Sequence, residues 1–137
     1  MIGMVIVTHL GIGSELLKAL NGIVGTQGQA RAIDIGAHDD MNQCRDLILA
    51  AVKDVNTGDG VVMLTDMFGG TPSNLAIAAM PSTKAVVLAG VNLPMLIKLA
   101  SVRQTMPLLD AVREAEQAAR KYIQLVSETI APPTAAA

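Results

Sequence analysis

Aromatic side chains are nearly absent from this chain of 137 residues, which has one phenylalanine, one tyrosine and no tryptophan. Surfaces that bind single-stranded nucleic acid or flavins use aromatic rings as stacking platforms, so this composition argues against both ligands. Excess positive charge is also missing, since 10 Lys and Arg stand against 12 Asp and Glu, for a net charge of −2. Without a basic stripe, we expect no nucleic-acid-binding surface.

Cysteine and long apolar runs are scarce as well. The only cysteine, Cys44, falls on an apolar helix face, and we interpret it as a core residue rather than a reactive or metal-binding one. No apolar run approaches the ~20 residues of a membrane-spanning helix, and Met1 leads directly into a strand pattern without a secretory signal. We therefore expect a soluble, cytoplasmic protein that does not insert into membranes.

Aliphatic residues dominate what is present. Hydrophobic residues make up 51% of the chain, so Ala, Val, Ile, Leu and Met must fill the core. This length is enough for one domain with a real core and too short for two ordinary domains. We predict one domain over residues 1–130 and a flexible tail, rich in Pro and Ala, over residues 131–137.

Strand patterns alternate with helix patterns along the chain. Short apolar or β-branched runs predict strands at residues 2–9, 30–35, 60–65 and 84–89. Helical spacing predicts helices over about 14–24, from Asp39 or Asp40 to 55, from 72 to 81, after an Asn92 cap, and over about 108–128. In the third of these helices, Thr71 is the predicted N-cap, Pro72 the first helical residue and Pro81 the end.

Two helices have a predicted apolar face. In the second helix this face contains Cys44, Leu47, Ile48, Ala51, Val52 and Val55. In the last helix it contains Leu109, Val112, Ala119, Ile123 and Val126. The alanine-rich side of the last helix could pack on the chain's own core or on a partner subunit.

The alternation of strands and helices predicts an α/β fold: an open, mostly parallel four-stranded sheet with helices on both faces. If the strand order is 2-1-3-4, the first and third strands are adjacent and the connection reverses between them. Ligands of open α/β sheets bind at such a switch point, beyond the carboxyl ends of the strands. The first strand ends in His9 and the third is followed by Asp66. Fold logic and residue chemistry therefore select the same crevice.

A histidine beside an aspartate suits phosphoryl transfer. Neutral imidazole is a nucleophile toward phosphorus, and its ring becomes cationic when one nitrogen takes the phosphoryl group. A carboxylate on the other nitrogen stabilises that cation. Asp66 would also fix the tautomer of His9, so that the lone pair of the far nitrogen points outward.

Glycines precede two of the predicted helices. Gly69, Gly70 and Thr71 would offer backbone N–H groups, a hydroxyl and a positive helix end to the oxygens of a phosphoryl group. Gly11 and Gly13 repeat this arrangement before the first helix. We therefore predict phosphate contacts at Gly11, Gly69, Gly70 and Thr71, and no metal or cofactor site.

Three stretches of the chain resemble the IIA component of the mannose-family sugar phosphotransferase system. They are Val7–Gly11, Leu64–Asn74 and Ala89–Leu96, and the resemblance runs from residue 1 to about 130. It implies a flavodoxin-like sheet and a homodimer in which a strand is exchanged between subunits.

The resemblance also implies roles for single residues. His9 would accept a phosphoryl group from the histidine phosphocarrier protein HPr and pass it to a IIB component, while Asp66 holds the imidazole. Thr71 would be the hydroxyl residue beside the phosphate, at a position where the family commonly has serine. Leu10 and Phe68 stand where glycine and tryptophan are frequent. Two functions remain open: a carrier in sugar uptake, or a stand-alone regulatory IIA-like module whose phosphorylation controls a partner protein.

Other readings of the same residues fit less well. A two-component receiver also has an aspartate where Asp66 lies, but it needs an acidic pair where this chain has Thr8 and His9. A flavodoxin-like FMN binder would need an aromatic stack. A hydrolase based on Ser73 lacks the G-x-S-x-G elbow. A zinc site from His9, Asp66 and His38 has no ligand-like spacing.

Overall fold

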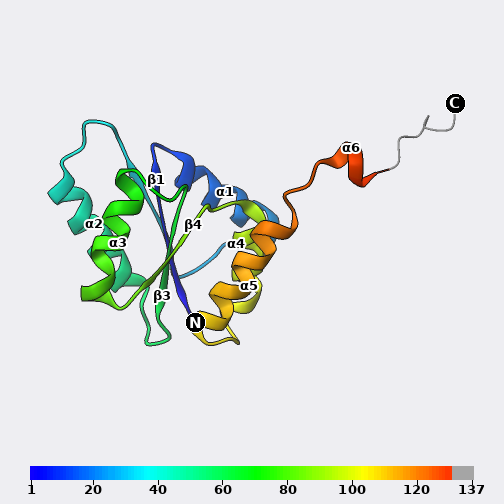
Figure 1. Cartoon of the computed structure of the whole chain (residues 1–137). Coiled ribbons are helices and arrows are strands. Elements are labelled where there is room, and N and C mark those ends of the chain that lie inside the picture. The colour runs from blue at the N-terminus through cyan, green and yellow to red at the C-terminus, as the bar shows by residue number, and fades with distance from the viewer. Residues whose placement is uncertain (131–137) are drawn as a thin grey trace, which may run out of the picture.

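The computed structural model describes residues 1–130. Four parallel strands form one open sheet in the order β2-β1-β3-β4, which confirms the predicted order (Figure 1). The strands are β1 (Gly3–His9), β2 (Ala30–Ile35), β3 (Val61–Thr65) and β4 (Val86–Ala89). The predicted tail at 131–137 lies outside the described residues.

Helices cover both faces of the sheet, with α2 and α3 on one side and α1, α4 and α5 on the other (Figure 1). Their bounds are α1 (Ile12–Val24), α2 (Met41–Val55), α3 (Thr71–Thr83), α4 (Leu93–Val102), α5 (Leu108–Lys121) and α6 (Val126–Thr129). Among the described residues, no helix combines the length and the apolar character needed to cross a bilayer.

The central strand β1 shows why both helical layers are needed. Met4 and Ile6 pack in one hydrophobic cluster, and Val5 and Val7 pack in the other. All four side chains are fully buried, as expected for a parallel strand covered on both faces. Cys44 lies in the second cluster, in agreement with its interpretation as a core residue, and burial raises the pKa of its thiol.

The predicted ends of α3 are wrong. Gly70, with φ of 88°, is the N-cap, and Thr71 is already helical. Pro81 lies inside the helix, which continues to Thr83. Pro81 has no backbone N–H, so it removes one hydrogen bond of the helix. In the last turn the hydroxyl of Thr83 donates to the carbonyl oxygen of Ala79, at a distance of 2.7 Å. The helix stops instead at Lys84, which has a left-handed φ of 57°.

The predicted last helix is wrong at its C-terminal end. α5 stops at Lys121, and an extended segment leads to the short helix α6, away from the sheet (Figure 1). Ile123 and Val126 are exposed, because the chain has turned away from the core by then. The alanine-rich side of α5 is buried within the chain itself, through Ala111, Ala115, Ala118 and Ala119. It therefore gives no support to a subunit interface.

Two leucines depart from their predicted apolar faces. Leu47 of α2 and Leu109 of α5 are both more than half exposed. In each helix, the face that is buried against the core is narrower than the apolar face predicted from the sequence. The rest of the α2 stripe, from Cys44 to Val55, is buried as predicted.

Candidate functional site

Two of the predicted site residues, His9 and Asp66, contact each other at the ends of two adjacent strands. His9 is the last residue of β1, and Asp66 follows the last residue of β3. β1 and β3 are parallel neighbours, with Val7 opposite Thr65, so their carboxyl ends meet at one edge. The ring Nδ1 of His9 lies 2.8 Å from Asp66 Oδ2. The structure therefore brings together the two residues that were selected from the sequence.

This contact determines which ring nitrogen of His9 is available. An ionised carboxylate can only accept hydrogen bonds, so the proton must sit on Nδ1 of the imidazole. Nε2 then carries the free lone pair. The His9 side chain is 44% exposed whereas that of Asp66 is 13% exposed. The mostly buried carboxylate thus positions a ring whose Nε2 side remains accessible.

Asp66 is held as an anion by several donors. Burial alone raises the pKa of its carboxyl group, but the backbone N–H of His9, its ring and its charge outweigh that effect, and the pKa lies below the ordinary value. The backbone N–H of His9 donates to Oδ2 at 2.9 Å, and that of Met67 donates to Oδ1 at 3.1 Å. An anion fixed in this way is suited to stabilise a cationic ring.

Gly70 lies against the free side of the imidazole. A Cβ atom at this position would lie 3.2 Å from Cε1 and 3.3 Å from Nε2 of His9. Gly70 is also the N-cap of α3, where no side chain caps the helix. The N-terminus of α3, with the exposed residue Thr71, therefore opens next to Nε2. Backbone N–H groups and the positive end of the helix are available there to an anion such as a phosphoryl group.

The N-terminus of α1 is different, because side chains of the protein already bind its amides. The backbone N–H of Gly13 donates to Thr8 Oγ1 at 2.7 Å, and that of Ser14 donates to Asp34 Oδ1 at 3.3 Å. Ser14 Oγ also donates to this carboxylate, at 2.5 Å. Gly11 is the exposed N-cap of α1, but the negative charge of Asp34 nearby disfavours a second anion. The geometry thus favours α3 over α1 for a phosphate.

Sequence reasoning missed this difference between the two loops. Asp34 and Thr8 were not selected, although both precede the end of a strand by one residue and are polar in otherwise apolar surroundings. That position was the available signal. The left-handed backbone of Leu10, with φ of 48°, was missed as well. The sequence signal for this conformation was Leu10 itself, a bulky residue at a position where the resemblance implies a frequent glycine.

The remaining alternative sites are not assembled. Within residues 1–130, no group of three or more His, Cys, Asp or Glu could hold a metal ion, so His9, Asp66 and His38 do not form a zinc site. His38 is exposed in the loop before α2. Ser73 is fully buried, and its hydroxyl has no hydrogen-bond partner. A buried hydroxyl without a base is not a nucleophile for hydrolysis.

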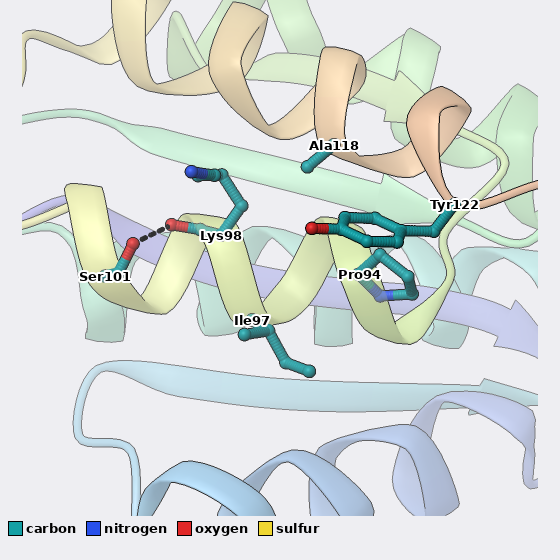
Figure 2. Close-up of a pocket in the computed structure, with 6 residues that line it drawn as sticks. All are labelled: Pro94, Ile97, Lys98, Ser101, Ala118 and Tyr122. Atoms are coloured by element: carbon teal, nitrogen blue, oxygen red, sulfur yellow. Dashed lines mark hydrogen bonds between the residues drawn. The ribbon is translucent and has the colours of Figure 1, made fainter.

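A pocket of about 420 Å³ between α4 and α5 is separate from this chemistry (Figure 2). Figure 2 shows the Tyr122 ring lying over Pro94, with Lys98 and Ile97 along the same helix. Among the described residues, Lys98 is the only charged one that lines it. None of the lining residues belongs to the loops that carry His9 and Asp66.

Comparison with known proteins gives a consistent result. Residues 3–116 match the model of the EIIA-man family, described as the PTS system fructose IIA component. The PTS system fructose-specific EIIA component of Bacillus subtilis (strain 168) is 27% identical over 129 residues, which cover 93% of this chain and 88% of that protein. The PTS system mannose-specific EIIAB component of Escherichia coli (strain K12) is 30% identical over 142 residues, which cover 99% of this chain but 44% of that protein.

A solved structure agrees. The phosphotransferase system component EIIA from Streptococcus agalactiae superposes with a TM-score of 0.85 at 29% identity, over 93% of this chain and 99% of that one. These matches confirm the resemblance that the three motifs predicted, and the superposition shows that the fold is shared. The chain therefore belongs to the EIIA-man family of sugar phosphotransferase system IIA components.

Proposed function

We propose that this protein is a phosphoryl carrier in which His9 accepts the phosphoryl group on Nε2. The observation that carries the proposal is the 2.8 Å contact between His9 Nδ1 and Asp66 Oδ2. It leaves the Nε2 lone pair free beside the uncapped N-terminus of α3. The contact therefore supports Nε2 as the nucleophilic atom and the N-terminus of α3 as the place where the phosphoryl oxygens would bind.

The transfer step balances without a further reactant. The Nε2 lone pair of neutral His9 attacks the phosphorus of a phosphohistidine donor, a new N–P bond forms, and the donor's N–P bond breaks. The electron pair of the broken bond returns to the donor imidazole. His9 keeps its proton on Nδ1 and becomes a cationic phosphoimidazole, which the Asp66 carboxylate stabilises. In the second half of the cycle an acceptor takes the phosphoryl group from Nε2.

The family assignment supports HPr as the donor and a IIB component as the acceptor. The relative from Escherichia coli is named a mannose-specific EIIAB component. A regulatory IIA-like module would share the His9 chemistry and differ only in the protein that follows, so the test below applies to both functions. We propose one domain over residues 1–130 that both accepts and passes on the phosphoryl group, and we propose that the protein is cytoplasmic.

We also propose a homodimer with strand exchange. The edge strand β4 is only partly buried, and within residues 1–130 it pairs with β3 alone. Beside it lies a groove of about 200 Å³, lined in part by Leu88, Ala89 and Ile123. The segment after α5 exposes five large apolar side chains: Tyr122, Ile123, Leu125, Val126 and Ile130. A segment of this kind from a second copy would fit an open sheet edge.

The test of the carrier function is phosphorylation by phosphoenolpyruvate, enzyme I and HPr, followed by intact mass. We expect one acid-labile phosphoryl group per chain. His9→Ala should abolish the label and leave the circular dichroism spectrum unchanged, because the side chain is half exposed. His38→Ala is the matched control and should keep the label. A label that persists in His9→Ala would show that another residue is the acceptor.

A further inference from the structure

We propose that Thr8 is a positioning residue for phosphoryl transfer, because its hydroxyl group closes the loop that carries His9. The inference rests on the carrier function proposed above and extends it to a residue outside the reacting pair. Thr8 lies directly before His9 and is fully buried. Its hydroxyl accepts from the backbone N–H of Gly13 at 2.7 Å and donates to Leu10 O at 3.4 Å. One side chain thus binds both ends of the loop between β1 and α1.

Thr8 acts from the face of the sheet opposite to the reactive ring. Successive side chains of a strand point to opposite faces. Accordingly, Thr8 contacts α1 through Gly13, whereas His9 lies against the start of α3 at Gly70. Because Thr8 is buried on the far face, it does not reach a phosphoryl group on His9. Its effect on the reaction has to pass through the backbone of the loop.

The loop needs this support because it contains a strained residue. Leu10 has a φ of 48°, in the left-handed region that disfavours residues with a Cβ atom. Its side chain is 64% exposed, so core packing does not compensate for the strain. Its backbone N–H donates to Ile35 O at 2.9 Å, and its carbonyl accepts from Thr8. Without the Thr8 hydroxyl, the Leu10 backbone can relax towards a negative φ, and His9, which precedes it, moves with it.

The packing around the hydroxyl leaves no room for a carbon atom in its place. A Cβ atom at Gly13 would lie 3.0 Å from Thr8 Oγ1 and 3.1 Å from Ile6 Cγ2, so α1 begins in direct contact with β1. The Gly13 nitrogen lies 2.7 Å from the hydroxyl because the two are hydrogen-bonded, whereas a methyl carbon would need roughly 3.5 Å. Valine at position 8 would therefore displace the first turn of α1 as well as remove the hydrogen bond.

A second threonine provides a matched comparison. Thr65 precedes Asp66 at the end of β3, just as Thr8 precedes His9 at the end of β1, and both threonines are fully buried. Among residues 1–130, the hydroxyl of Thr65 has no hydrogen-bond partner. Thr65→Val therefore removes a buried hydroxyl beside the same site without breaking a hydrogen bond, and it serves as the control.

The experiment measures labelling by phospho-HPr and the ¹⁵N NMR spectrum of the His9 ring. We expect Thr8→Val to slow labelling about tenfold, because small misplacements of reacting groups are costly. Its spectrum should show more of the tautomer that carries the proton on Nε2, because the contact of Nδ1 with Asp66 is weakened. Thr8→Ser keeps the hydroxyl and should retain the wild-type rate and spectrum. Thr65→Val should change neither.

The outcomes separate this inference from the carrier function. A folded Thr8→Val protein with the wild-type rate and spectrum would overturn the inference, even at a lower melting temperature, because Thr8 would then contribute only to stability. Equal slowing of Thr8→Ser and Thr8→Val would overturn it too, since the hydroxyl would not be the group that matters. If Thr8→Val does not fold, Thr8→Ala removes the hydroxyl without pushing α1 away. If wild-type protein takes no label, the carrier function fails, while the NMR spectra still test the position of the ring.

Discussion

Asp66 receives two hydrogen bonds from His9 on the same oxygen, and they have different consequences. The backbone N–H of His9, at 2.9 Å, ties the carboxylate to the end of β1 regardless of the state of the ring. The ring Nδ1, at 2.8 Å, responds to the charge of the imidazole. In the proposed reaction the carboxylate would therefore stay in place while the ring gains and loses a phosphoryl group, which is a form of preorganisation.

Asp66→Asn tests the electrostatic part of this arrangement. Asparagine can still accept from Nδ1, but it carries no negative charge to stabilise the cationic ring. A hydrogen bond to a charged group contributes roughly 1.5–3 kcal/mol, so transfer from phospho-HPr should slow by about one to two orders of magnitude in single-turnover labelling. Asp34→Asn, at the same edge but bound to Ser14, should leave the rate unchanged. Complete loss of label in a folded Asp66→Asn protein would instead favour Asp66 as the acceptor.

The stability of the protein should depend on the same carboxylate in acid. The pKa of Asp66 is lowered in the folded state, so its ionised form stabilises the fold above the unfolded pKa of about 3.9. That contribution is lost as pH falls through the lower, folded pKa. We predict that the free energy of unfolding in urea drops between pH 5 and pH 3 less steeply in Asp66→Asn than in the wild type. Parallel acid slopes would contradict this linkage.

At the residue scale, sequence reasoning could pair His9 with Asp66 but could not describe Leu10. The pairing follows from two buried strand patterns that end in polar residues. The predicted strand order then makes these two strands neighbours, so their carboxyl ends meet at one edge of the sheet. The φ of Leu10 depends on how the loop between β1 and α1 closes, which local propensity does not encode. The capture of the α1 amides by Asp34 depends likewise on the register between β1 and β2.

At the element scale, the loop from β3 to α3 has two consecutive glycines with positive φ, of 92° at Gly69 and 88° at Gly70. Only Gly70 approaches His9, while a Cβ atom at Gly69 would meet nothing within 4 Å. The loop thus separates two requirements for glycine. One is conformational and applies to both positions; the other is the close approach to the imidazole and applies to Gly70.

Alanine substitutions distinguish these requirements. Gly69→Ala and Gly70→Ala should each destabilise the fold by about 1–3 kcal/mol through backbone strain, measured by thermal or urea unfolding. Gly70→Ala should also displace the His9 ring and slow labelling by about ten- to a hundredfold, since small misplacements of reacting groups are costly. Gly69→Ala should label at nearly the wild-type rate. Equal labelling of the two variants would mean that the contact at Gly70 does not position the ring.

Strands were easier to predict than helix ends. All four strands lie within the predicted ranges, because buried apolar runs bounded by polar or small residues are a strong local signal. Helix ends depend on tertiary contacts instead. α3 continues past Pro81 to Thr83, and α5 stops at Lys121, two residues after its last buried residue, Ala119. Apolar residues beyond that point predicted a helix that the chain does not form.

At the scale of the whole molecule, the segment after α5 carries apolar side chains that do not pack against the rest of residues 1–130. Five large apolar side chains lie exposed between Tyr122 and Ile130, and β4 forms one edge of the sheet. Exposed edges and apolar segments are usually covered in native proteins. The proposed exchange of this segment between two copies would cover both features at once.

Oligomeric state can be tested by light scattering at micromolar concentration. We predict a dimer for the wild type and a monomer for the double variant Ile123→Asp, Leu125→Asp, because two buried charges would disfavour the exchanged segment. Leu109→Asp, an equally drastic change at an exposed position of α5, should remain dimeric. A monomeric wild type would contradict the dimer without affecting the assignment of His9.

The central claim is that Asp66 holds Nδ1 of His9 and leaves Nε2 to take the phosphoryl group. The most direct measurement is NMR of the phosphorylated protein labelled with ¹⁵N, in which coupling to phosphorus identifies the modified nitrogen. The structure predicts one phosphoryl group, bonded to Nε2 of His9, with Nδ1 still protonated toward Asp66. Phosphorus on Nδ1 of His9, on His38 or on the Asp66 carboxylate would contradict the account.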